Sequence, residues 1–378
     1  MPKDEIFVTR PHLPPLAELV PYLEKIWDRR ILTNGGPFHQ ELEARLCDYL
    51  GVPHISLFNN GTIALITALQ ALEVSGEVIT TPYSFVATSN ALLWNGIRPV
   101  FSDIDPITLN LDPERIESAI TEHTSAILPV HCYGRPCAVE AMEKIAQKHN
   151  LKLVYDAAHA FGVRNGDRGI LNYGDLSILS FHATKVFNTF EGGAIVSHTP
   201  EMKRVIDNLK NFGFVNETTV VQAGINGKMS EINCAVGLLQ LEHLESAIAQ
   251  RQSIARYYNH HLSLIPGITI VGGNLLESSN HSYYPILVEQ EYPISRDELY
   301  EYLKSKGIFS RRYFYPLISD LKMFQGIPSG AASNIPVAKK IADKVLCLPI
   351  YPDLDQDSLE RIVSEIAAPG SSSQVQRR

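Results

Sequence analysis

Cysteine is scarce in this sequence, and the few cysteines form none of the usual cysteine motifs. The 378 residues include five, at Cys47, Cys132, Cys137, Cys234 and Cys347. No two of them form a C-x-x-C pair, and none has metal-ligand spacing with the histidines. We therefore expect reduced thiols, as in a cytosolic protein, and neither a structural zinc nor another bound metal.

Long apolar runs and an excess of positive charge are also absent. Residues 1–5 contain no apolar signal core, and no uninterrupted apolar stretch is long enough to cross a bilayer. The net charge of −8 offers no basic surface to a nucleic acid, so an anionic ligand would need a local site. The sequence therefore predicts a cytoplasmic protein with no nucleic-acid or membrane partner.

The order of the sequence patterns indicates the fold class. From residue 54 to residue 196, short β-rich runs alternate with helical patterns such as 61–72 and 139–149. This alternation predicts an α/β fold with a largely parallel sheet, whose strands are apolar throughout because both faces are covered. The expected strands are 54–58, 78–80, 99–104, 126–131, 151–155, 176–181 and 193–196.

The later part of the chain has a different character, and the length is ample for two domains. A helical pattern over residues 230–264 is longer than most globular helices and is expected to link the two domains. We expect a large α/β domain over 1–245, a smaller α+β domain over 246–368 and a disordered tail over 369–378. In the smaller domain the patterns predict strands at 268–271 and 282–288 and helices at 296–304 and 337–345.

Residues able to bind a ligand follow several of the predicted strands. In an open parallel sheet, ligands collect beyond the carboxyl ends of the strands. Gly61 and Thr62 open a helix there, and the free N–H groups at its start suit a phosphate. Phe85 could stack on a flat ring. Each has a more common structural role, as a helix-capping turn or as core packing.

Asp156, Ser180 and Lys185 follow two further strands. Asp156 could keep a ring nitrogen protonated, and Ser180 could donate to the same phosphate as Gly61. Lys185, held beside apolar strands, would have a nucleophilic amine that can form a Schiff base, although a lysine after a strand is usually solvated. Together these residues describe one cofactor, pyridoxal 5′-phosphate (PLP), which needs a lysine, an acid and a helix N-terminus.

Longer motifs resemble the sugar aminotransferases of the DegT/StrS type over nearly the whole chain. That family has fold type I, the fold of aspartate aminotransferase, so the resemblance implies a mostly parallel seven-stranded sheet with a smaller α+β domain. The motifs are Leu32-Thr33-Asn34-Gly35-Gly36-Pro37, Asn60-Gly61-Thr62, Tyr155-Asp156-Ala157-Ala158-His159, Ser180-Phe181-His182-Ala183-Thr184-Lys185, Glu191-Gly192-Gly193 and Gly224-x-Asn226-x-Lys228-Met229-Ser230-Glu231.

The resemblance implies a role for each matching residue. Lys185 would carry PLP as a Schiff base and act as acid and base, Asp156 would pair with the pyridine nitrogen, and His159 would lie near the ring oxygen. Asn233 would reach the phosphate in the neighbouring subunit, so a homodimer with shared active sites is implied. The remaining cofactor contacts would come from Gly61, Thr62, Phe85 and Ser180.

The resemblance is greatest to enzymes that form dTDP-4-amino-4,6-dideoxyglucose from the dTDP-linked 4-keto sugar, with L-glutamate as amino donor. Residues 212–229 would then cross to the partner and help to hold the nucleotide sugar. Lys228 stands where many relatives have arginine, which removes bidentate recognition of a phosphate. The expected substrate-binding residues are His182, Glu191, Lys228, Tyr313 and Tyr315.

Other functions stay open at this point. Enzymes that aminate the 3-position of a dTDP-3-keto-6-deoxyhexose share much of the same pattern. A PLP-binding regulator or a nucleotide-sugar binding protein would not need Lys185 and Asp156 together, and a sugar dehydratase on this scaffold would have histidine in place of Lys185. A nicotinamide enzyme is disfavoured because no G-x-G-x-x-G follows the first strand.

Overall fold

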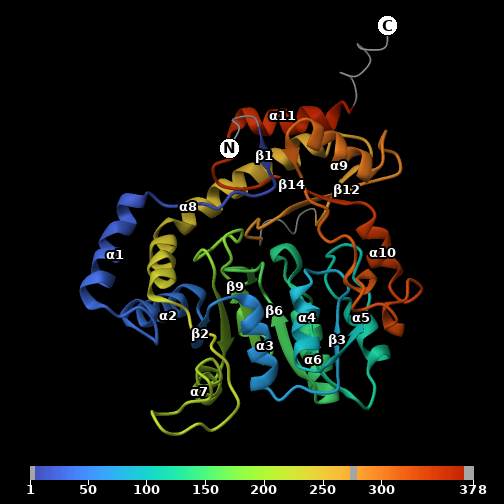
Figure 1. Cartoon of the computed structure of the whole chain (residues 1–378). Helices are drawn as coiled ribbons and strands as arrows, with labels where there is room; N and C mark the ends of the chain where they lie inside the picture. Colours follow the sequence, from blue (N-terminus) through green and yellow to red (C-terminus); the bar gives the residue numbers. More distant parts are fainter. Residues whose placement is uncertain (1–4, 273–278, 370–378) are drawn as a thin grey trace.

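The computed structural model describes residues 5–272 and 279–369, which form two lobes (Figure 1). The larger lobe contains a seven-stranded sheet with helices on both faces, and the smaller lobe lies above the ends of its strands. The helix α8 (Glu231–Leu262) runs from one lobe to the other. Within the described ranges, no helix combines the length and apolar character needed to cross a membrane.

The central sheet confirms the predicted fold class. Its strands are β2 (His54–Phe58), β3 (Glu77–Thr80), β4 (Arg98–Phe101), β5 (Thr124–Leu128), β6 (Lys152–Asp156), β9 (Leu176–Ser180) and β10 (Gly193–Ser197). Their order is β2-β10-β9-β6-β5-β3-β4. Only β10 runs antiparallel to its neighbours in this sheet. The carboxyl ends of the other six strands therefore point the same way, toward the smaller lobe.

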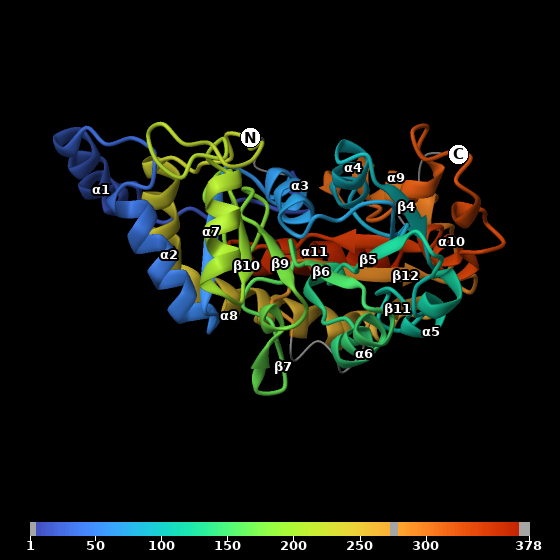
Figure 2. The same cartoon turned by 90° about the horizontal axis from the view of Figure 1, so that it is seen from below.

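Helices cover both faces of the sheet, which makes three layers (Figure 2). Neighbouring residues of one strand accordingly enter different cores: Val154 packs with Ile178 beneath α3, whereas Leu153 packs with Met142 of α6. This is why the strands are apolar on both sides. The helices of this lobe are α1 (Leu16–Arg29), α2 (Pro37–Leu50), α3 (Gly61–Ala71), α4 (Ala87–Trp94), α5 (Pro113–Ile116), α6 (Val139–His149) and α7 (Pro200–Leu209).

Short elements complete the fold. A two-stranded hairpin, β7 (Arg164–Asn165) and β8 (Arg168–Gly169), projects from the larger lobe (Figure 2). Single turns of 3-10 helix connect several strands and helices of the chain. They are η1 (Glu117–Ala119), η2 (Cys132–Gly134), η3 (Ile170–Asn172), η5 (Ile318–Asp320) and η6 (Pro328–Gly330).

The long helix α8 joins two hydrophobic cores. Near its start Leu238 packs with α2, and near its end Tyr258 packs with the strands of the smaller lobe. The helix begins where the Ser230 side chain accepts a hydrogen bond from the Asn233 amide, as N-cap residues do. The domain boundary predicted after residue 245 falls inside this helix.

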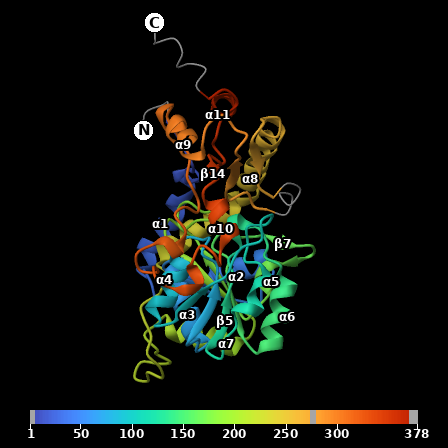
Figure 3. The same cartoon turned by 90° about the vertical axis from the view of Figure 1, so that its right-hand side faces the viewer.

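The smaller lobe is built on a three-stranded antiparallel sheet, and Figure 3 shows it as a cap above the large sheet. The N-terminal strand β1 joins this lobe, because it pairs with β13. Its elements are β1 (Ile6–Phe7), β11 (Ile268–Ile270), β12 (Tyr284–Val288), α9 (Arg296–Ser305), β13 (Ile308–Phe309), α10 (Pro336–Ala342), β14 (Val345–Leu348) and α11 (Gln356–Ala367).

Two predictions for the later chain need comment. The helix predicted over 337–345 is wrong at its end, since α10 stops at Ala342 and Val345 begins β14. The reason is tertiary: Val345 pairs with Leu287 in the buried three-stranded sheet, and strand pairing prevails over the local helical pattern. The tail predicted over 369–378 lies outside the described residues except for Pro369.

Candidate active site

Residues that follow four parallel strands line one cavity of about 270 Å³. They come from the loops after β2, β3, β6 and β9, and the smaller lobe closes the space with Tyr283, Tyr313 and Phe314. This is where ligands collect on open α/β sheets. The predicted site residues that line it are Gly61, Thr62, Phe85, Asp156, His159, Ser180, His182, Lys185, Glu191 and Tyr313.

Lys185 lies between β9 and β10, with its side chain turned into the cavity. Its Nζ is 3.5 Å from the Tyr283 hydroxyl and 5.8 Å from the centre of that ring. Burial lowers the pKa of Lys185 to about 8, and the nearby Asp156 carboxylate opposes this shift. The amine is therefore far more often unprotonated than an ordinary lysine, which makes it nucleophilic at near-neutral pH.

Asp156 ends β6 and is 4% exposed. Its Oδ2 accepts a hydrogen bond from Thr88 Oγ1 at 2.8 Å, and its Oδ1 accepts one from the Ala158 amide at 3.1 Å. Burial raises the pKa of Asp156, whereas these two hydrogen bonds and the charge of Lys185 act against the rise. The carboxylate thus stands at the cavity wall with its two oxygens fixed in direction.

His159 follows Asp156 in the same loop and presents a neutral ring. Burial lowers the pKa of His159 well below its ordinary value, and Lys185 lowers it further. The ring stacks on Phe314, with 5.9 Å between centres, and meets the edge of Tyr283 at 4.8 Å. Its buried Nδ1 has no hydrogen-bond partner among the described residues, so a ligand in the cavity could supply one.

The start of α3 presents backbone amides to one end of the cavity, where an anion could bind. Asn60 caps this helix by accepting from the Ile63 amide at 2.8 Å, while the amides of Gly61 and Thr62 lack a partner within the described ranges. A Cβ atom at Gly61 would lie 3.0 Å from the Cβ of Ser180. A larger residue at Gly61 would therefore crowd Ser180, whose hydroxyl lies beside the start of α3 and its free amides.

Phe85 presents an aromatic ring face that no other ring of the described residues contacts. It lines the cavity, its side chain is 57% exposed, and no other ring of the described chain stacks on it. An exposed phenylalanine in a cavity wall is a stacking surface for a flat ligand.

Three predicted site residues lie outside this cavity. Lys228 donates to Asn211 Oδ1 at 2.8 Å, and Asn233 donates to the carbonyl of Thr189 at 2.6 Å. Tyr315 lies under the guanidinium of Arg296. Their roles toward a cofactor or sugar stay predictions.

Among the residues that were not predicted from the sequence, Thr88, Tyr283 and Phe314 contact predicted site residues. Thr88 stands three positions after Phe85 in the first turn of α4, and no local signal indicates that it reaches Asp156. Tyr283 directly precedes the apolar strand β12, and Phe314 follows the predicted Tyr313. Nothing local to these two indicates that the smaller lobe brings them to this cavity.

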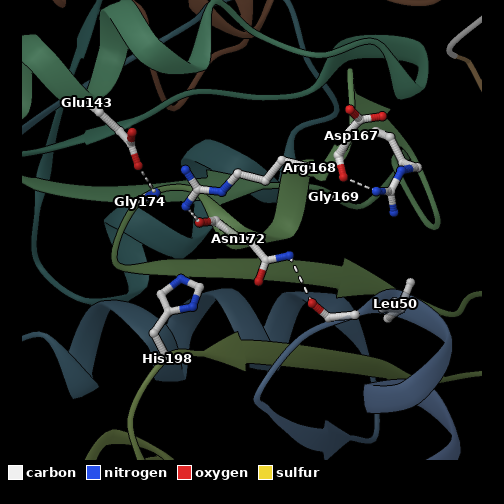
Figure 4. Close-up of a pocket in the computed structure, with 10 residues that line it drawn as sticks. Leu50, Glu143, Asp167, Arg168, Gly169, Asn172, Gly174 and His198 are labelled. Atoms are coloured by element: carbon white, nitrogen blue, oxygen red, sulfur yellow. Dashed lines mark hydrogen bonds between the residues drawn. The ribbon is translucent and has the colours of Figure 1, made fainter.

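A second hollow, of about 590 Å³, lies at the amino ends of the parallel strands. Figure 4 shows the residues that line it. It contains Gly174, just before β9, and His198, just after β10. Its two arginines already donate to backbone carbonyls, Arg164 to Asp167 and Arg168 to Asn172. None of the predicted site residues lines it, so this hollow is not the site indicated by the sequence.

Similar proteins match nearly the whole chain. Residues 16–367 match the model of the DegT/DnrJ/EryC1/StrS aminotransferase family. A dTDP-4-amino-4,6-dideoxy-D-glucose transaminase from Shigella dysenteriae is 59% identical over 361 residues, which cover 96% of this chain and 98% of the relative.

Two solved structures have a similar fold. DesI, determined in the presence of its TDP-sugar product, superposes with a TM-score of 0.91 at 36% identity, covering 96% of this chain and 92% of its own. NtdA from Bacillus subtilis, with bound cofactor PMP, has a TM-score of 0.84 at 28% identity, with 96% and 86% covered.

Proposed function

The chain belongs to the DegT/DnrJ/EryC1/StrS aminotransferase family, and from this premise we propose that it uses PLP to transfer the amino group of L-glutamate to a nucleotide-linked keto sugar. The proposed acceptor is dTDP-4-keto-6-deoxy-D-glucose, and the product is dTDP-4-amino-4,6-dideoxy-D-glucose. The name of the Shigella relative supports this choice of sugar. The observation that carries the proposal is the position of Lys185 and Asp156 on one cavity that also has an anion-binding end.

The residues present fit PLP at each point where that group needs a partner. The free amides of α3 and the Ser180 hydroxyl suit its phosphate, Phe85 suits a ring face, and the buried Asp156 suits a ring nitrogen. The orphaned Nδ1 of His159 is available to a ring substituent. The cavity is slightly smaller than the roughly 300 Å³ at which small-ligand pockets usually begin.

When bound, PLP supplies an aldehyde that exchanges amino groups and a ring that withdraws electrons from the reacting carbon. Lys185 has two roles in this proposal. Its amine, with the lowered pKa, would hold the cofactor through the aldehyde carbon. The same amine, when free, would take the proton from the donor Cα, and in the second half-reaction it would give a proton to the sugar carbon.

Asp156 acts through its charge. A carboxylate in a buried site interacts strongly with a protonated ring nitrogen, and it keeps that nitrogen protonated. His159, being neutral, adds no competing positive charge beside Lys185. Over a complete cycle glutamate becomes 2-oxoglutarate and the sugar carbonyl becomes an amine, so that atoms and electrons balance without a further reactant.

We propose that the active unit is a homodimer with shared sites. Large apolar side chains are exposed on α1, where Trp27 is 70% exposed, and on the loop over residues 212–229, at Val220 and Val221. Exposed apolar surface of this kind is typical of protein interfaces. In a dimer, Asn233 and Lys228 reach the cofactor phosphate and nucleotide sugar in the site of the partner.

A single incubation tests the function. In each incubation the holoenzyme is mixed with glutamate and one nucleotide sugar, taken from a set of dTDP- and UDP-linked 3-keto and 4-keto sugars. The amino sugar that forms is identified by NMR. We expect turnover of the dTDP-linked 4-keto sugar. Consumption of a 3-keto sugar alone would contradict the proposed acceptor. A visible cofactor band that glutamate leaves unchanged would indicate a binding protein and contradict the transaminase.

A further inference from the structure

A buried chain of hydroxyl groups ends on the Asp156 carboxylate. Ser84 Oγ lies 2.9 Å from Thr88 Oγ1, which lies 2.8 Å from Asp156 Oδ2. Ser84 is 4% exposed and Thr88 is fully buried. Both hydroxyls lie in the segment that leads from β3 into α4, whereas Asp156 ends β6, so the chain joins two separate strand ends.

The direction of each hydrogen bond follows from chemistry. An ionised carboxylate can only accept, so the single hydroxyl proton of Thr88 is committed to Asp156 Oδ2. Thr88 must then accept from Ser84 in the other contact. Two hydroxyls donating in sequence toward one anion polarise each other, which strengthens the bond to the carboxylate. The Ala158 amide donates to the other oxygen, so both oxygens are held.

We propose that Thr88, supported by Ser84, is a positioning residue that fixes the plane of the Asp156 carboxylate and keeps its negative charge available to the cofactor ring nitrogen. The inference rests on the proposed function, because it concerns how Asp156 meets PLP. A carboxylate without Thr88 would compete with the ring nitrogen for the shared proton. The ring would then lose the positive charge for which Asp156 is needed.

Few other ionisable groups act on this carboxylate. Lys185 faces it from the loop after β9 and favours its charged form. The thiols of Cys132 and Cys137 lie within electrostatic reach, but burial raises the pKa of both, so they stay neutral. His159 also stays neutral, since burial lowers its pKa. The Thr88 hydroxyl is therefore the main partner of the carboxylate that a substitution can remove without changing a charge.

The test uses holoenzyme loaded with PLP labelled with ¹⁵N in the ring, and reads the protonated fraction of the ring nitrogen from its NMR signal. Thr88→Val keeps the shape and removes the hydroxyl. We expect the ratio of protonated to unprotonated ring nitrogen to fall about tenfold to hundredfold, as for one lost hydrogen bond to a charged group. Thr88→Ser restores the hydroxyl and should restore the ratio.

Ser89→Ala is the matched control, because the neighbouring buried Ser89 hydroxyl has no partner among the described residues and its removal should leave the signal unchanged. A Thr88→Val signal equal to that of the wild type overturns the inference. If Thr88→Val does not fold, Ser84→Ala decides, since a smaller fall in the protonated fraction of the ring nitrogen supports the inference and an unchanged fraction overturns it. A wild-type protein that takes up no PLP, or whose ring nitrogen is never protonated, refutes the proposed function instead.

Discussion

The amine of Lys185 and the hydroxyl of Tyr283 lie 3.5 Å apart, although one belongs to the sheet lobe and the other to the smaller lobe. Burial raises the pKa of Tyr283 above its ordinary value, so its hydroxyl keeps its proton near neutral pH. No other polar side chain of the described residues hydrogen-bonds to Lys185 Nζ. Tyr283 is thus placed to orient the amine whenever it is free.

Removing this hydroxyl should slow the chemical step. We expect Tyr283→Phe to reduce kcat about twofold to tenfold, the range for one hydrogen bond, while the KM for glutamate changes little. The measurement is steady-state kinetics of the holoenzyme. Tyr302→Phe is the control, because the Tyr302 hydroxyl bonds to Glu365 far from the cavity. An equal loss in both variants would contradict an orienting role for Tyr283.

The lowered pKa of Lys185 predicts how cofactor uptake depends on pH. Below about 8 the amine is protonated and cannot attack the aldehyde, so the rate of PLP uptake by the cofactor-free protein should rise with pH through about 8 and then level off. Stopped-flow absorbance measures this rate. A midpoint near the ordinary lysine value of 10.5 would show that the amine is not desolvated.

The pH dependence of PLP uptake also tests the electrostatic coupling between Lys185 and Asp156. The Asp156 carboxylate favours the charged form of the lysine and so raises its pKa. Asp156→Asn removes that charge, and the midpoint of uptake should move to lower pH. A shift to higher pH, or none, would mean that the two groups do not interact.

Glu231 is predicted to hold α2 to the start of α8. It is buried, and its two oxygens accept from the amides of Phe38 and His39, each at 2.9 Å. Glu231→Gln replaces one acceptor by a donor that faces an amide, so urea unfolding should show a loss of roughly 2 kcal/mol. Glu242→Gln, at an exposed site of the same helix, should cost far less. Similar losses of unfolding free energy in the two variants would argue against a role of Glu231 in holding α2 to α8.

The proposed dimer predicts which exposed tryptophan matters. Trp27→Glu places a charge on the apolar surface of α1 and should weaken self-association, as measured by sedimentation at several concentrations. Trp94 is also exposed, at the end of α4 away from the cavity, and Trp94→Glu should leave association unchanged. A wild-type protein that sediments as a monomer at all concentrations would contradict the dimer.

Much of the cavity was predictable because its residues belong to local motifs. Asp156 ends one apolar strand and Lys185 lies in the loop after another, and parallel strands bring their carboxyl ends to one side of the sheet. Contacts between distant segments were not predictable in this way. The meeting of Tyr283 with Lys185 depends on how two lobes pack, and Thr88 reaches Asp156 only because β3 and β6 lie in one sheet.

Local pattern also failed where tertiary pairing decides structure. Residues 337–345 look helical, but Val345 pairs with β12 and is a strand residue. The roles proposed for Lys228 and Asn233 rest on the proposed second subunit, whose position no local pattern in the sequence indicates.

The most direct test is to find where the cofactor is attached. Freshly purified holoprotein is treated with borohydride, digested, and mapped by peptide mass spectrometry. The account predicts one pyridoxyl adduct, on the peptide that contains Lys185, and none in Lys185→Ala. An adduct on a different lysine, or none in the wild-type protein, would contradict it.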